Sequence, residues 1–216
     1  KRSTAQAVPR VAGRKRPSAS GHQRRPLIMR ITGGQWVNHN IAVPPGQGVR
    51  PTPDKVRQAI FNSLGPWIEG ASVLELFAGS GALCLECLSR GAVSAVAVEK
   101  SSKHAGFIRR NTQSLRVRID VRVQCALLAV KQLVEAKRQF DFICADPPYG
   151  DKTAPGQRSE SWAQRLLDEP ALPQLLAPEG RLLLGHTKRD VIELAEPWRE
   201  RQTLKHGDTW IRILEV

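Results

Sequence analysis

The chain has 216 residues, 41% of them hydrophobic, which is enough for one sizeable domain with a real core. It carries a net charge of +13, and no apolar run approaches the ~20 residues that cross a bilayer, which argues against a membrane protein. The first 26 residues hold eight Lys/Arg and no Asp or Glu, and removing these eight charges leaves +5 for residues 27–216. Such an uneven field indicates a polyanionic partner such as nucleic acid; a solvated tail or an Arg-rich transit peptide has the same composition.

Four cysteines bear on the redox compartment. Cys84 and Cys87 form a C-x-x-C pair, but they lie in a predicted helix with no second Cys/His pair nearby. Structural zinc needs four ligands, and none of the five histidines falls at ligand spacing. We therefore expect no metal, and we interpret the cysteines as reduced, mostly buried thiols of a cytoplasmic protein.

The N-terminal part divides into a tail and an extension. Residues 1–26 mix Arg, Pro, Ser and Gly with little apolar content, so we expect a disordered basic tail. Residues 27–70 form the extension. Within it, 27–43 predicts two short strands around a Gly-Gly pair, a hairpin, and Asp54 is expected to cap a helix that runs to about Leu64.

Residues 71–216 alternate between short strands and helices, as expected of a single domain. Strands are predicted at 72–77, 93–99, 119–124, 139–145 and 181–186, with helices near 81–90, 101–115, 126–137 and 159–176. Such alternation implies parallel β-α units with helices on both faces of a buried sheet. Strands at 199–205 and 209–215 predict a final antiparallel hairpin. The expected fold is an α/β, doubly wound, mostly parallel seven-stranded sheet with an N-terminal hairpin and helix extension.

Two features at the ends of the first two strands favour a nucleoside cofactor. The first strand carries Glu75 and runs into a turn with Gly79 and Gly81, where glycine lets a ligand approach the backbone at a helix N-terminus. The second strand ends in Glu99, and a carboxylate there can accept both hydroxyl hydrogens of a ribose. These features do not separate NAD from S-adenosylmethionine.

The fourth strand ends in Asp146-Pro147-Pro148-Tyr149, which distinguishes the two cofactors. Proline cannot donate a hydrogen bond, so this loop presents two acceptors, the Asp146 carboxylate and the Pro147 carbonyl. An exocyclic amine offers two donors, which is a chemical match, and Tyr149 supplies a face on which a flipped base can stack. The loop predicts methyl transfer from S-adenosylmethionine to an exocyclic amine of a nucleic-acid base.

The chain resembles the bacterial 16S rRNA (guanine966-N2)-methyltransferase family over most of residues 27–216. The similar stretches are R-I-T-G-G-Q-W at 30–36, R-P-T-P-D-K-V-R at 50–57 with Phe61-Asn62, residues 73–83, L-S-R-G at 88–91, and residues 146–149. The resemblance implies a class I, Rossmann-like enzyme, a monomer, that methylates guanine N2 in small-subunit ribosomal RNA, either free or within an assembly particle. Two alternatives stay open: an adenine-N6 or cytosine-N4 DNA methyltransferase, and a non-catalytic RNA-binding assembly factor.

By that resemblance the site residues fall into three groups. The guanine amine would be held by the catalytic residues Asp146, Pro147, Pro148 and Tyr149. The cofactor would be contacted by Glu75, Phe77, Gly79, Gly81, Glu99, Cys125 and Asp146. Substrate RNA would be contacted by Arg30, Trp36, Arg50, Thr52 and Asn62.

The chain departs from the family pattern at four places. Glu75 replaces a usual Asp, and Cys125 stands where an Asp usually contacts the adenine amine. The basic run after Trp36 is replaced by V-N-H-N, and the fifth strand ends in G-H-T-K at 185–188 instead of near a Glu. Such departures are expected of a diverged paralogue. In it, the basic N-terminal tail would make the phosphate contacts that the lost basic run made.

Overall fold

The computed structural model describes residues 28–45, 52–148 and 160–216, so the predicted disordered tail lies outside the described residues. A two-stranded antiparallel sheet pairs β1 (Ile28–Arg30) with β2 (Asn40–Ala42), as the hairpin prediction requires. The large sheet contains β3 (Ser72–Leu76), β4 (Ser94–Val98), β5 (Asp120–Arg122), β6 (Phe140–Ala145), β7 (Leu176–Thr187), β8 (Arg199–His206) and β9 (Thr209–Glu215).

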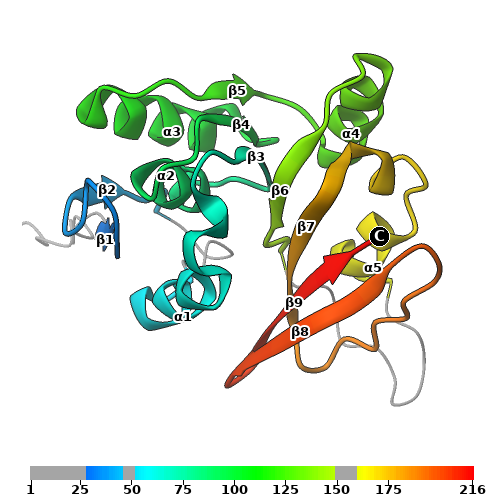
Figure 1. The fold of residues 1–216 in the computed structure, drawn as a ribbon. Coiled ribbons are helices and arrows are strands. Elements are labelled where there is room, and N and C mark those ends of the chain that lie inside the picture. Colours follow the sequence, from blue (N-terminus) through cyan, green and yellow to red (C-terminus); the bar gives the residue numbers. More distant parts are fainter. Residues whose placement is uncertain (1–27, 46–51, 149–159) are drawn as a thin grey trace, which may run out of the picture.

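The seven strands of the large sheet are ordered β5-β4-β3-β6-β7-β9-β8. The pairs among β3 to β7 are parallel, whereas β9 runs antiparallel to both of its neighbours. Figure 1 shows this sheet crossing the molecule with β8 and β9 at one edge. The predicted doubly wound, mostly parallel seven-stranded sheet is therefore confirmed.

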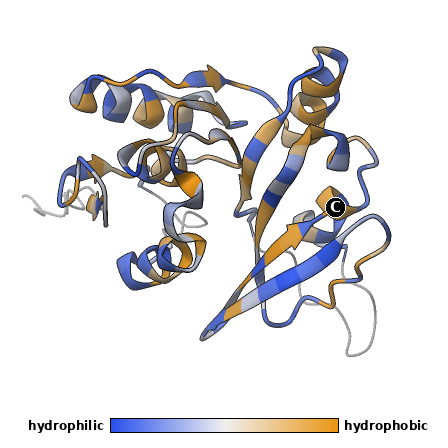
Figure 2. Ribbon diagram, viewed as in Figure 1, coloured by the Kyte–Doolittle hydropathy of each residue, from blue (hydrophilic) through white to orange (hydrophobic). Residues whose placement is uncertain are grey.

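Helices cover both faces of the large sheet, and each face buries its own hydrophobic core beneath them. On one face pack α1 (Asp54–Leu64), α2 (Ala82–Ser89) and α3 (Ser102–Leu115), and on the other α4 (Ala126–Glu135) and α5 (Trp162–Leu167). Neighbouring residues of a strand point to opposite faces of the sheet. Val73 therefore packs in the core beneath α1 to α3, and Leu74 in the core beneath α4 and α5. Figure 2 shows the central strands as hydrophobic and the edge strand β8 as mostly hydrophilic. No helix in the described ranges is long and apolar enough to span a membrane.

The helix predicted near 159–176 is wrong in extent. Only α5 is α-helical there; a 3-10 turn, η2 (Pro173–Leu175), follows, and β7 begins at Leu176 instead of 181. Pro170 and Pro173 explain the difference, because proline lacks the backbone N–H that a continuing helix needs. A second 3-10 turn, η1 (Gly65–Ile68), follows α1.

Two buried charged side chains, Arg57 of α1 and Glu86 of α2, connect the small β1–β2 sheet to these helices. The Arg57 guanidinium, 1% exposed, donates to the backbone oxygens of Thr52 and Arg30. Its Nε lies 3.8 Å from the buried Glu86 carboxylate, which accepts bonds from Thr32 N and Oγ1. Because such buried charges are costly unless paired, this network fixes how the hairpin sits on α2.

Asp54 begins α1 as predicted, but its capping role is wrong. The N-cap residue is Pro53, and no side chain caps the helix. The Asp54 carboxylate instead accepts from Arg57 Nη2 at 3.0 Å and from Arg30 Nη2 at 3.3 Å. Two guanidinium groups thus outcompete the helix N–H groups for this carboxylate, because charge-assisted bonds are the stronger ones.

Gly34→Ala is expected to loosen the hairpin from α2. Gly34 has φ +78°, and a Cβ there would lie 1.8 Å from the Ser89 carbonyl oxygen, a backbone atom that cannot rotate away. Gly70 also has φ +78°, but its Cβ would meet nothing within 4 Å, so Gly70→Ala adds only left-handed strain of about 1 kcal/mol. We expect Gly34→Ala to lower the free energy of unfolding by about 2 kcal/mol more than the control. Equal losses in urea denaturation would contradict this packing.

Candidate active site

The glycine-containing turn after β3 is built from left-handed backbone. Phe77 (φ 59°), Gly79 (φ 54°) and Gly81 (φ 75°) reverse the chain before α2 begins at Ala82. Ala78 N donates to the Val98 carbonyl at 3.0 Å, which ties this turn to the end of β4. The turn therefore presents backbone at the carboxyl edge of the sheet, where open α/β sheets bind ligands.

Glu75 holds the N-terminus of α2. Its side chain, 4% exposed, accepts from Cys84 N at 2.8 Å and from Leu83 N at 3.3 Å. Burial raises the pKa of Glu75 to about 7, and these two backbone bonds oppose the rise. Glu75 also lines the cavity described below, so one carboxyl group both anchors the helix and faces the site.

Glu75→Gln is expected to remove a pH dependence of stability. Because the folded pKa of about 7 lies above the ordinary 4.5, Glu75 stabilises the fold below pH 4.5, and that contribution is lost as the pH rises through 7. The shift corresponds to about 3 kcal/mol. Urea denaturation at pH 4.5 and pH 8 should show the wild type losing about 3 kcal/mol relative to the variant. Parallel profiles for the two proteins would contradict the assignment.

Glu99 binds the glycine turn from the end of β4. Its Oε2 accepts from Gly79 N at 2.8 Å and its Oε1 from Ser101 N at 2.8 Å, while His104 Nδ1 lies 3.7 Å from Oε1. Each carboxylate oxygen has two lone pairs, so one backbone bond apiece leaves capacity for further donors. The geometry thus allows Glu99 to accept from a ligand diol without releasing the turn.

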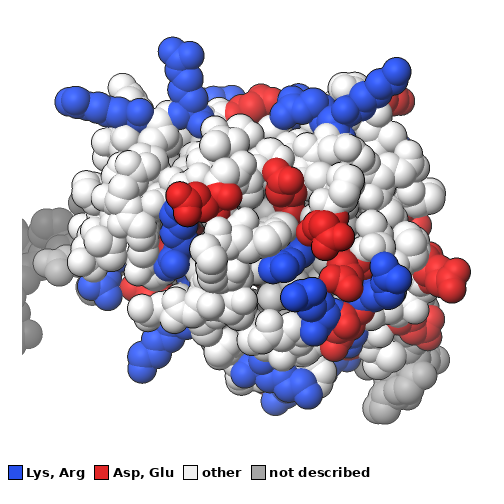
Figure 3. Space-filling view, viewed as in Figure 1, with Lys and Arg blue, Asp and Glu red and all other residues white. Residues whose placement is uncertain are grey.

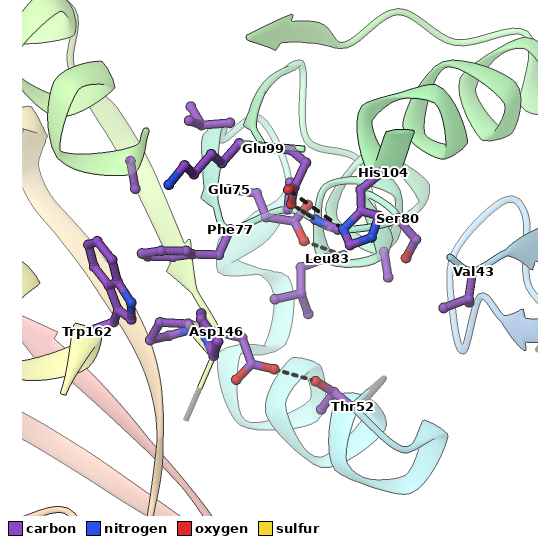
Figure 4. A pocket seen from close by; sticks show the side chains of 18 of the residues that line it. Val43, Thr52, Glu75, Phe77, Ser80, Leu83, Glu99, His104, Asp146 and Trp162 are labelled. Atoms are coloured by element: carbon purple, nitrogen blue, oxygen red, sulfur yellow. Dashed lines mark hydrogen bonds and ion pairs between the residues drawn. The ribbon is translucent and has the colours of Figure 1, made fainter. Parts of the chain in front are cut away.

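Asp146 follows β6 and is oriented by Thr52, which lies just before α1. Thr52 Oγ1 donates to Asp146 Oδ2 at 2.8 Å, as Figure 4 shows. Burial raises the pKa of Asp146, and the bond from Thr52 opposes that rise. On the neighbouring strand β7, a Cβ added to Gly185 would lie 2.5 Å from Asp146 Oδ1, so glycine there makes room for the carboxylate.

A cavity of about 440 Å³ brings most of the predicted site together. Its lining includes the predicted residues Thr52, Glu75, Phe77, Gly79, Glu99, Cys125, Asp146, Pro147 and Pro148. Figure 4 shows Asp146 and Thr52 at one end of this group, with Glu75 and Glu99 further along. The sequence therefore predicted residues that meet in space, although their contacts with a cofactor or base stay predictions.

The remaining predicted residues lie elsewhere. Arg50 and Tyr149 fall outside the described residues. Gly81 caps α2 but does not line the cavity, and neither do Arg30, Trp36 and Asn62. Trp36 is half-buried and packs against the core beneath α1 to α3 and against the cluster under the β1–β2 hairpin, and Asn62 is exposed on α1. Arg30, 60% exposed, pairs with Asp54. Contacts of these side chains with RNA stay predictions.

The cavity residues that the sequence reasoning missed include His104, Trp162 and Gln124. His104, from α3, lies beside Glu99, and Trp162, from α5, packs edge-on against Phe77 with ring centroids 5.7 Å apart. Gln124 also lines the cavity, directly before Cys125. Its position next to Cys125, a predicted cofactor residue, could have indicated it from the sequence. The places of His104 and Trp162 in the cavity result from tertiary packing and could not have been read from the sequence.

The C-x-x-C pair has a packing role. Cys84 and Cys87 are free thiols on α2, each 0% exposed, as the interpretation of buried reduced cysteines expects. Burial raises the pKa of Cys84 well above its ordinary value, which keeps the thiol protonated. Within the part of the chain that the structure describes, no three His, Cys, Asp or Glu side chains gather as a metal site would require.

Comparisons with known proteins agree with this geometry. The model of the family described as conserved hypothetical protein 95 matches residues 29–215. Ribosomal RNA small subunit methyltransferase D of Escherichia coli (strain K12) is 37% identical over 135 residues, which are 62% of this chain and 65% of that protein. The chain thus spans slightly less than two thirds of the length of that relative.

Solved structures share the fold. A hypothetical protein of Thermus thermophilus, TTHA0928, superposes with a TM-score of 0.70 at 25% identity, covering 87% of this chain and 99% of that one. The Thermus thermophilus 16S rRNA N2 G1207 methyltransferase (RsmC), solved with AdoMet and guanosine, gives a TM-score of 0.61 at 22% identity, covering 88% of this chain and 50% of that one.

The strand order, the glycine turn and these superpositions define a class I methyltransferase fold. Within that class, the chain belongs to the family described as conserved hypothetical protein 95. The resemblance to the bacterial 16S rRNA (guanine966-N2)-methyltransferase family is thereby confirmed.

Proposed function

We propose that this protein transfers a methyl group from S-adenosylmethionine to an exocyclic amine of ribosomal RNA, guanine N2 in the small-subunit RNA. The observation that carries the proposal is the Asp146-Pro147-Pro148 loop, which borders the same cavity as the glycine turn and Glu99. The loop proposed to accept the amine and the edge proposed to bind the nucleoside thus border one cavity.

The residues around the cavity fit S-adenosylmethionine. Glu99 keeps acceptor capacity for a ribose diol, and the carboxyl group of Glu75 can face the cationic amino group of the methionine part. Gly79 itself carries no side chain, so a cofactor could approach the backbone of the turn at this position. Bound there, the cofactor would supply a methyl group carried by a positively charged sulfur. The leaving group is a neutral thioether, which needs no protonation to depart.

The chain's own contribution is to hold and orient the amine. The Asp146 carboxylate and the Pro147 carbonyl accept the two N–H bonds, which turns the nitrogen lone pair toward the methyl donor. Thr52 fixes the carboxylate through Oδ2, so little reorganisation is needed. We expect Asp146, whose pKa burial raises, also to take the proton that the methylated amine releases.

The choice of ribosomal RNA rests on the relatives and on charge. The Escherichia coli relative is named for small-subunit ribosomal RNA, and the Thermus enzyme RsmC was solved with guanosine. On the face drawn in Figure 3, basic and acidic side chains are intermingled. By sequence, the first 26 residues contribute eight of the 13 net positive charges. We expect such a basic tail to bind phosphates in ribosomal RNA or an assembly particle in the cytoplasm.

Methyl transfer to defined substrates tests the proposal. The purified protein with tritium-labelled S-adenosylmethionine should label 16S ribosomal RNA, either free or in small-subunit particles, and mass spectrometry should find the label on a guanine N2. Labelling of duplex DNA alone would favour the DNA methyltransferase instead. Failure of S-adenosylmethionine to bind in calorimetry at millimolar concentration would refute the enzyme and leave the assembly factor.

A further inference from the structure

Thr52, which orients the Asp146 carboxylate, is held by a side chain and not by the helix that follows it. The first backbone bonds of α1 go to the Pro53 carbonyl, from Val56 N at 2.9 Å and from Arg57 N at 3.0 Å. The Thr52 carbonyl instead accepts from Arg57 Nη1 at 2.8 Å. The position of Thr52 in front of the helix is therefore fixed by the Arg57 guanidinium.

Thr52 thus links the guanidinium to the carboxylate that borders the cavity. Its carbonyl accepts from Arg57, and its Oγ1 donates to Asp146 Oδ2 at 2.8 Å. Among the residues that the structure describes, no other group donates a hydrogen bond to that carboxylate, and Gly185 leaves room beside its Oδ1. The orientation of the carboxylate therefore follows the position of Thr52, and through it the position of Arg57.

Arg57 is itself held in one orientation by fixed partners. Its Nη2 donates to the Arg30 carbonyl of β1 and to Asp54 Oδ1 at 3.0 Å, and its Nε lies 3.8 Å from Glu86 Oε2. A planar guanidinium makes such bonds in set directions, which a lysine ammonium cannot reproduce. With 1% of its surface exposed, Arg57 can support the site from within the protein but is too deeply buried to hold the substrate.

We propose that Arg57 is a positioning residue for methyl transfer, acting on the Asp146 carboxylate through Thr52. The inference rests on the proposed function, in which that carboxylate holds the amine to be methylated. Loss of the Arg57 guanidinium should therefore slow the transfer step, while the affinity for S-adenosylmethionine stays the same.

A double-mutant cycle between Arg57 and Thr52 tests this role, with the single-turnover rate of methyl transfer into saturating 16S ribosomal RNA as the readout. Thr52→Val removes the hydroxyl but keeps the carbonyl that Arg57 binds, and Arg57→Lys keeps the charge but not the directed bonds. We expect each single variant to transfer about tenfold more slowly than the wild type. In the Thr52→Val background, Arg57→Lys should slow transfer by less than about twofold, because its path to Asp146 is already cut.

Arg90→Lys is the matched control, because it makes the same substitution beside the same buried carboxylate. Arg90 Nη2 lies 3.0 Å from Glu86 Oε1 and donates to Thr32 Oγ1, and none of the contacts described for Arg90 reaches Thr52. We expect Arg90→Lys to transfer within about twofold of its parent in both backgrounds. A loss for Arg90→Lys that vanished in the Thr52→Val background would overturn the assignment, because it would trace the effect to Glu86.

Asp54→Asn decides the question if Arg57→Lys does not fold. The Asp54 side chain is 39% exposed, and its Oδ1 orients Arg57 Nη2, so the substitution should loosen Arg57 while the fold persists. We expect about threefold slower transfer in the Thr52 background and no change in the Thr52→Val background. Any other result for this pair of proteins would overturn the proposal.

The remaining outcomes separate positioning from general stability. A purely structural Arg57 would slow transfer by the same factor in both backgrounds, and a wild-type rate for Arg57→Lys would show that it does not position Asp146; either result would overturn the proposal while the proposed function stands. Calorimetry with S-adenosylmethionine should give wild-type affinity for every variant, and a parallel loss of affinity in Arg57→Lys would also overturn it. Absence of transfer by the wild type would instead refute the proposed function, and this inference with it.

Discussion

Asp146→Asn is expected to lower methyl transfer by about 10²–10³-fold, with binding of S-adenosylmethionine changed little. The asparagine NH₂ replaces an oxygen acceptor by a donor at the atom that is to hold the amine, while the side chain keeps its size. An oxygen remains to accept from Thr52, so the fold around the loop should persist. Single-turnover transfer of tritiated methyl groups into ribosomal RNA measures the rate, and calorimetry measures cofactor affinity.

A matched control variant shows whether the effect depends on the position of Asp146 or follows any Asp-to-Asn change. Asp120→Asn makes the same change at a half-exposed carboxylate of β5, whose partner is Arg122, and should leave transfer within about twofold of the wild type. Transfer by Asp146→Asn within tenfold of the wild type would show that the carboxylate is not the amine's main acceptor. Loss of cofactor binding in that variant would instead show that Asp146 acts mainly through its predicted cofactor contact.

The sequence predicted the sheet well because its signals are local. Short apolar strands such as 140–145 are buried on both faces, so their composition alone marks them, and the strand ends carry Glu75, Glu99 and Asp146. In a parallel sheet the carboxyl ends share one edge, so these three carboxylates were expected to meet and do line one cavity. Periodicity and topology together thus predict the centre of the site.

The parts that the sequence did not predict depend on contacts between distant segments. Asp54 has the sequence position of a helix cap, yet Arg30, 24 residues earlier, and Arg57 bind its carboxylate. Trp162 borders the cavity only because α5 packs against Phe77. Periodicity carries no information on such pairs, because it describes which face of an element is buried and not what lies opposite.

Gly185→Ala, at a position that is not itself a predicted ligand contact, is expected to lower methyl transfer by about 10²-fold. A Cβ at this position of β7 would lie 2.5 Å from Asp146 Oδ1 and 3.1 Å from its Cγ. The Asp146 carboxylate would have to rotate away from Thr52, and a displacement of about 1 Å in a positioning group has an effect of that size. The rate of transfer into ribosomal RNA is the measurement.

Gly106→Ala is the matched control, because a Cβ at this glycine in the middle of α3 would meet nothing within 4 Å. Alanine in a helix interior should raise the free energy of unfolding by about 0.5–1 kcal/mol and leave transfer unchanged. Cofactor affinity separates two causes in Gly185→Ala: a slow variant with wild-type affinity has a misplaced Asp146, whereas parallel loss of both indicates a collapsed cavity. Wild-type transfer by Gly185→Ala would show that the position of Asp146 does not set the rate.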